Sequence, residues 1–168
     1  GVVSQILVDF TEDLEPAVAM NPNLYRLVNS TNPATPISLG TPVYTAGTKA
    51  ALTTALGGNA DLAYVARFPG VAGNNISVRY VPAGALSVSV VGSAITVNVP
   101  AGTTAAGVRQ AIMNNVAANT LVDVEFAPGN NGSGVVAAFG PSLLAGGTGS
   151  RVTIPITPAL PDELYTFS

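Results

Sequence analysis

Short runs in which apolar and polar residues alternate, separated by glycine, proline and asparagine, occupy the middle of this chain. A two-residue period places successive side chains on opposite faces of a strand, so such runs predict antiparallel strands with one buried face. The turn Gly92-Ser93 is expected to close a tight hairpin between the last two runs. The apolar members of the four runs are Leu62, Tyr64, Ala66 and Phe68; Ile76, Val78 and Tyr80; Leu86, Val88 and Val90; and Ile95, Val97 and Val99.

A helical period interrupts this rhythm over residues 103–118. Thr103 or Thr104 is suited to cap the first turn, because a threonine hydroxyl can accept a hydrogen bond from a free backbone N–H. A strand is expected again over residues 120–126, so residues 86–126 predict a β-β-α-β unit with the helix packed on a small sheet. The apolar face of the helix, expected in the core, is Ala105, Val108, Ala111, Ile112 and Val116.

The N-terminal third has weaker patterns. Residues 2–10 and 24–28 predict strands, and residues 49–56 fit either two helical turns or a strand. Residues 29–42 contain three prolines and are expected to form a loop or extended arm. Together these patterns predict a mainly β, α+β fold of antiparallel, β-sandwich-like sheets with one helix.

The predicted organisation is one compact domain with arms. It comprises N-terminal strands and a proline-rich loop (1–60), a β-rich core (61–150) and an extended C-terminal arm (151–168). Prolines at 155, 158 and 161 disfavour a helix or a place inside a sheet for this arm. The arm could lie on a neighbouring subunit or fold back over its own domain. The residues expected to make contacts are Val152, Ile154, Ile156, Leu160, Leu164, Tyr165 and Phe167 in the arm, with Ile37 and Leu39 in the proline-rich loop.

Charge is scarce in this chain. Charged residues make up 9% of it, against about 25% in an ordinary soluble domain. A folded monomer keeps itself dispersed with charged side chains. Hydrophobic residues reach 48%, yet no stretch is long enough to span a bilayer, and no membrane partner is expected. We therefore expect other subunits to cover much of the surface, which is typical of an assembling, structural protein.

The absence of histidine and cysteine excludes most catalytic and metal chemistry. A Ser-His-Asp triad, a Cys-His pair and an ordinary zinc site all need one of these residues. Carboxylate chemistry has no convincing pair, since Asp123 and Glu125 share one face of a predicted strand and Asp162 and Glu163 are adjacent. We therefore predict neither an enzyme nor a cofactor.

Acidic residues cluster near the N-terminus, at Asp9, Glu12, Asp13 and Glu15. The cluster lacks the alternating D-x-D-x-D-G spacing of a calcium loop, so a solvated loop is the preferred interpretation over a cation site. No basic region followed by an apolar core is present, so no signal peptide is expected. Gly1 fits either removal of an initiator methionine or cleavage by a maturation protease.

Basic residues are few and dispersed, and the net charge is −3. Nucleic-acid binding needs clustered positive charge to displace counterions, and a P-loop needs its G-x-x-x-x-G-K-[ST] spacing. Neither pattern occurs, so neither nucleic acid nor nucleotide is expected as a partner. The six basic residues are Arg26, Lys49, Arg67, Arg79, Arg109 and Arg151.

The sequence of residues 62–149 resembles structural proteins of tailed bacteriophages, tail sheath proteins among them. The resemblance rests on LAYVARFPGVAGNNISVR at 62–79, GTTAAGVRQAI at 102–112 followed by Asn114-Asn115, and LAGGTG at 144–149. It covers just over half of the chain. It implies a structural protein of the virion, made in the bacterial host cytoplasm, with other virion subunits as partners.

Size and composition favour one member of that class, a decoration (cement) protein on the exterior of the capsid. Its expected partners are the major capsid protein and copies of itself in a homo-oligomer, with a trimer as one option. A tail tube or sheath-like protein is the alternative, although sheath proteins are larger and tube subunits need a long hairpin. A second alternative is a carbohydrate-binding or adhesin module that uses the aromatic rings of Tyr25 or Tyr44. The sequence leaves the capsid or tail location and the oligomeric state open.

Overall fold

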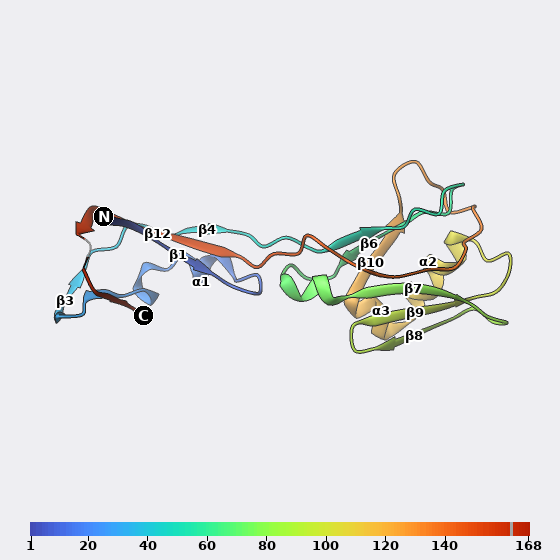
Figure 1. Cartoon of the computed structure of the whole chain (residues 1–168), viewed down its shortest axis with the longest axis horizontal. Coiled ribbons are helices and arrows are strands. Elements are labelled where there is room, and N and C mark those ends of the chain that lie inside the picture. The colour runs from blue at the N-terminus through green and yellow to red at the C-terminus, as the bar shows by residue number, and fades with distance from the viewer. Residues whose placement is uncertain (162) are drawn as a thin grey trace. The chain divides into compact units, whose positions relative to one another are not determined.

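The computed structural model describes residues 1–161 and 163–168 and divides the chain into two compact units (Figure 1). Unit 1 contains residues 1–47 and 149–168, and unit 2 contains residues 48–148. The fold is mainly β with a few short helices, as the alternating pattern predicted. The division differs from the expected single domain with two arms, because β1 (Val2–Asp9) pairs with β12 (Arg151–Pro161) and joins the two ends of the chain.

Unit 1 consists of two three-stranded antiparallel sheets with two short helical turns, α1 (Pro16–Ala19) and η1 (Pro22–Leu24). One sheet has the order β1-β12-β4, with β4 at Val43–Thr45. The other has the order β13-β2-β3, formed by Tyr165–Phe167, Leu27–Asn29 and Asn32–Ile37. Buried Ala19, Val152 and Ile154 form its core, against which Ile6, Val8, Phe10, Leu14, Tyr25, Leu39, Tyr44 and Phe167 pack.

The C-terminal segment was expected to lie outside any sheet, and this prediction is wrong for β12. This strand is the middle strand of its sheet, and its prolines are accommodated by local pairing. β4 pairs only with residues 151–153, so Pro155 and Pro161 pair with β1 alone, and Pro158 lies where the register with β1 is interrupted. Proline is tolerated at such positions because its missing N–H breaks no ladder bond. The Pro155 carbonyl still accepts a hydrogen bond from the Gly40 N–H at 2.7 Å.

Unit 2 contains two sheets and two helices around one core. The first sheet has the antiparallel order β10-β6-β5, formed by Val122–Phe126, Leu62–Ala66 and Ala51–Thr53. The second has the order β11-β7-β9-β8, formed by Phe139–Leu143, Ser77–Pro82, Ala94–Val99 and Ser87–Val91. The turn η2 (Val71–Asn75) connects β6 to β7, and the helices α2 (Ala105–Asn114) and α3 (Val116–Leu121) follow β9.

Two details of the predicted topology are corrected. β7 and β9 are parallel, because the hairpin β8–β9 joins β7 through its second strand. β10 pairs with β6 and not with the hairpin, so the predicted β-β-α-β unit is divided between two sheets. α2 contacts β10, β8 and β9, and α3 contacts β8 and β10, so the helices bridge the two sheets.

The buried face of unit 2 follows the two-residue period closely. Leu62, Tyr64 and Ala66 on β6 are buried, and so are the inward residues of β7 and β9. The hydroxyls of Tyr64 and Tyr80 hydrogen-bond to each other, joining one strand of each sheet across the core. Burial raises the pKa of both hydroxyls, because a phenolate would lose its hydration there.

The helix expected over residues 103–118 is interrupted at Asn115. Of the two predicted caps, Thr104 caps α2 by accepting from the Gly107 N–H at 3.3 Å. Asn115 is extended (φ −87°, ψ 110°), so it ends α2 and caps α3 by accepting from the Ala118 N–H at 2.9 Å. Its amide group also donates to the Val88 carbonyl at 3.0 Å and ties the helices to β8.

Replacing Asn115 with alanine is expected to lower the free energy of unfolding by about 1–2 kcal/mol, since a helix cap and a bond to β8 are both lost. Chemical denaturation followed by circular dichroism measures the change. Asn114→Ala is the matched control, because the side chain of Asn114 is exposed and bonds only that of Gln110 within the described part of the chain. Equal losses in the two variants would contradict the role given to Asn115.

Candidate functional site

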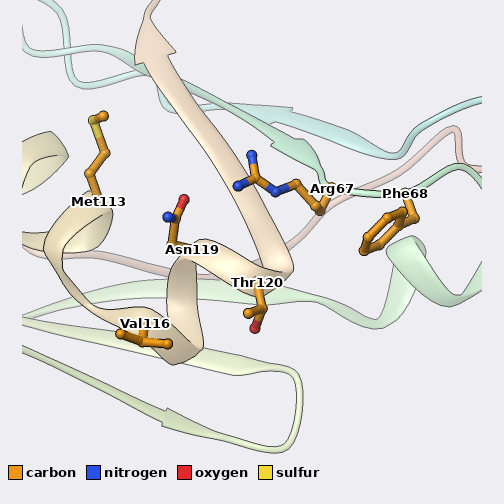
Figure 2. A pocket seen from close by; sticks show the side chains of 6 residues that line it. All are labelled: Arg67, Phe68, Met113, Val116, Asn119 and Thr120. Carbon is orange, nitrogen blue, oxygen red and sulfur yellow. The ribbon is translucent and has the colours of Figure 1, made fainter.

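An open pocket of about 240 Å³ lies on the surface of unit 2, where the end of β6 meets the two helices. Figure 2 shows that its side chains come from two short segments: residues 67–68, and residues 113–120 of α2 and α3. Three of them are apolar and three are polar. The lining residues are Arg67, Phe68, Met113, Val116, Asn119 and Thr120.

The path of the backbone leaves the apolar side chains of the pocket exposed to solvent. The Arg67 N–H donates to the Leu121 carbonyl at 2.8 Å, which fixes the chain after β6 beside the end of α3. Phe68 is then 73% exposed. Val116, the first residue of α3, is 81% exposed, and Met113 near the end of α2 is exposed as well. Several exposed large apolar side chains around one pocket commonly mark an interaction site.

The polar groups of the pocket are partly engaged. The Arg67 guanidinium pairs with Asp123 through one of its terminal nitrogens, and its side chain remains 39% exposed. The Thr120 hydroxyl donates to the Ala117 carbonyl at 2.7 Å. The pocket therefore combines apolar side chains with a partly exposed arginine. This combination suits an apolar side chain whose neighbouring residue is acidic.

Sequence reasoning missed this pocket because it assigned two of its residues to the core. Phe68 continued the period of β6, and Val116 continued the apolar face of one long helix. Both expectations are wrong, since β6 ends at Ala66 and the helix restarts after Asn115. Two signals were available: Pro69, which is unfavourable within a central strand, and the pair Asn114-Asn115, which is unfavourable within a helix.

The residues expected to make intersubunit contacts fall into two groups. Val152, Ile154 and Ile156 are buried inside unit 1, so the structure gives them a core role and corrects the expected contact role. Their strand, β12, is paired with β1 in the sheet of unit 1, and Ala19 of α1 belongs to the same buried core. Leu164 is 73% exposed. The remaining residues are partly buried: Ile37, Leu39, Leu160, Tyr165 and Phe167.

The two tyrosines considered as a sugar platform are built into unit 1. Tyr25 donates its hydroxyl to the Ala19 carbonyl at 2.7 Å, and its ring stacks on Phe167 with the centroids 6.0 Å apart. Tyr44 donates its hydroxyl to the Asp13 carboxylate. Both rings are half-buried, so neither presents a free aromatic face of the kind that sugar binding favours.

The acidic segment of unit 1 takes part in structural bonds. Asp9 forms a two-pronged ion pair with Arg151, and Asp13 also accepts from the Gly47 N–H at 2.9 Å. The Arg151 guanidinium lowers the pKa of Asp9, and the Tyr44 hydroxyl lowers that of Asp13. Among the described residues, no group of three or more acidic side chains is placed to hold a metal ion.

The two carboxylates of β10 are each matched by an arginine. Asp123 pairs with Arg67, and Glu125 receives two bonds from Arg109 at 2.8 and 2.9 Å. The Arg109 guanidinium also lies over the ring of Phe126, 5.3 Å from its centroid. These carboxylates act as ion-pair partners that hold α2 and the end of β6 to β10. Of the predicted pair in the tail, Asp162 lies outside the described residues, and Glu163 accepts from the Asn29 amide at 2.7 Å.

Within the described part of the chain, no helix has the length and hydropathy needed to traverse a bilayer. Comparison with models of protein families, with curated proteins and with solved structures finds no match to this chain.

Acid is expected to destabilise unit 1 through Asp9 and Asp13. A carboxyl whose pKa is lowered by folding stabilises the folded state fully above its usual value, near 3.8, and this stabilisation is lost as the pH falls through the lowered pKa. The unfolding midpoint should therefore decrease below about pH 4. Denaturation at a series of pH values measures this decrease.

The double variant Asp9→Asn with Asp13→Asn should show a flatter dependence on pH in this range. Tyr44→Phe provides a second comparison, because it keeps the Asp13 carboxylate and removes the hydroxyl that donates to it. The same slope in the wild type and the double variant would refute this assignment.

Proposed function

We propose that this chain is a structural protein of a bacteriophage particle, and that it decorates the exterior of the head and stabilises it through contacts between subunits. The observation that carries the proposal is the balance of exposed apolar and charged groups. Sixteen large apolar side chains are exposed among the described residues, whereas the whole chain contains fifteen charged residues. Such a surface is unfavourable in water and is stabilised when other subunits cover it.

Exposed apolar groups occur on both units, as expected of a protein with several neighbours. In unit 1, Leu7 on β1 and Val43 on β4 flank Thr153 of β12, so they lie on the outward face of one sheet. The opposite face of this sheet carries the buried residues of the unit. An open sheet face with apolar residues on its outer strands suits a flat contact with a protein shell.

A tail structural protein is the alternative, and one observation favours it. The segment that resembles phage proteins, residues 62–149, covers most of unit 2, which begins at residue 48 and ends at residue 148, but not β5. The resemblance therefore concerns the larger part of one folded unit. Tail sheath proteins are among the proteins it resembles, so a place along the tail is the second proposal.

Locating the chain on intact particles tests the proposal. Immunogold labelling with antibodies against the purified chain, applied to particles released by the bacterium that encodes it, should mark the heads. Label along the tail would favour the alternative. Particles that carry no label would overturn both proposals.

The outward face of the sheet in unit 1 gives a quantitative test. Heads that lack the chain should open at a lower temperature in calorimetry, and added purified chain should restore the wild-type temperature.

The variant Leu7→Ser with Val43→Ser should bind these heads at least about tenfold more weakly, because two apolar side chains lose their burial. Asn114→Ala, at an exposed polar position of unit 2, is the control and should bind within a few-fold of the wild type. Equal binding of the double variant and the control would show that this sheet face does not contact the head.

A further inference from the structure

The two units of this chain have opposite formal charge. Unit 1 has six acidic and two basic residues, a charge of −4, whereas unit 2 has three acidic and four basic residues, a charge of +1. Together they make up the net charge of −3. Opposite charge on two separately folded parts of one chain favours contact between unlike units of neighbouring copies, and the field of each unit orients the approach.

The pocket of unit 2 has two features that its occupant must match. Its apolar surface, formed by Phe68, Met113 and Val116, is exposed and calls for an apolar side chain. The Arg67 side chain, which also lines the pocket, remains 39% exposed although it pairs with Asp123, and a carboxylate is the group that complements its charge. A guanidinium can bond two carboxylates at once, because it presents five N–H donors in one plane.

Unit 1 has an exposed apolar side chain next to a carboxylate at Glu163-Leu164. Leu164 is 73% exposed, although it is a large aliphatic residue. Glu163 precedes it, and the bond from the Asn29 amide reaches one carboxylate oxygen, Oε2. The backbone here is held, because the Ser30 N–H donates to the Leu164 carbonyl at 2.9 Å. The leucine is thus presented by a fixed segment, which lowers the entropy lost on binding.

We propose that the pocket on unit 2 of one copy receives Leu164 from unit 1 of a second copy, with Glu163 of that copy beside Arg67. The inference rests on the proposed structural function and identifies one contact between two copies of the chain. The contact joins two different surfaces, so repetition closes a ring or continues as a filament, depending on the rotation between copies. Each copy has both surfaces, and no further component is needed for the contact.

Two variants that each destroy one surface test the contact. Val116→Asp places a carboxylate in the pocket, and Leu164→Asp removes the apolar side chain that enters it. Both positions are mostly exposed, so folding should be retained, and circular dichroism verifies it. Each variant alone should associate at least about tenfold more weakly than the wild type in sedimentation equilibrium.

Mixing the two variants supplies the decisive measurement. The Val116→Asp chain keeps an intact Leu164 and the Leu164→Asp chain keeps an intact pocket, so an equimolar mixture should contain a heterodimer. Val91→Ser is the matched control for the pocket, because Val91 is a valine of unit 2 that is 80% exposed and does not line the pocket. It should associate as the wild type does. Glu163→Gln should weaken association by a few-fold at low salt and less at high salt.

Three results would overturn the inference: a wild-type chain that stays monomeric at every concentration, association that both aspartate variants retain, or a mixture that forms no heterodimer. Failure of the proposed function is seen separately in the labelling of particles. Heads that carry the chain while it shows no self-association would leave the proposed function standing without this contact. Self-association of a chain absent from particles would leave the contact standing without the proposed function.

Discussion

The side chain of Asn115 determines how the chain passes from one helix to the next, and the surface of unit 2 depends on that passage. Its carbonyl oxygen caps α3, and its amide group holds the helices to the Val88 carbonyl of β8. A continuous helix would have turned Val116 toward the core with Val108 and Ile112. The break turns Val116 outward, so that it lines the same pocket as Phe68. One polar side chain thus completes the packing of the unit and shapes its pocket.

Because the chain has few charged residues, its exposed apolar positions, including those of this pocket, are poorly compensated by charge on the surface. The three acidic residues of β1 and β10 are each paired with an arginine, and these pairs stabilise the units internally. Few charged groups then remain to keep apolar surface in water. The two units also differ in charge. This difference favours contact of unit 1 of one copy with unit 2 of another over contact between two identical units.

Local patterns predicted much of the fold. The two-residue period identified the buried residues of β6, β7 and β9. A cap at Thr103 or Thr104 was predicted from their place before an apolar helical face, and Thr104 is the cap. The pocket was not predicted, because Phe68 and Val116 both continue a regular period beyond the residue at which the backbone departs from it. At β12 the prolines led to the opposite error: they predicted a segment outside any sheet, whereas β1 pairs with this strand in spite of Pro155.

The sequence by itself determined the mainly β class, the strands of the core and the absence of histidine and cysteine chemistry, because each depends on residue type and on spacing along the chain. Only the tertiary structure decided that residues 151–161 form the centre of a sheet, that β9 lies parallel to β7, and that the chain forms two units. These features depend on pairing between segments far apart in sequence, such as β1 with β12. Local periodicity shows which face of a strand is buried, but it contains no information on which distant strand completes its hydrogen bonds.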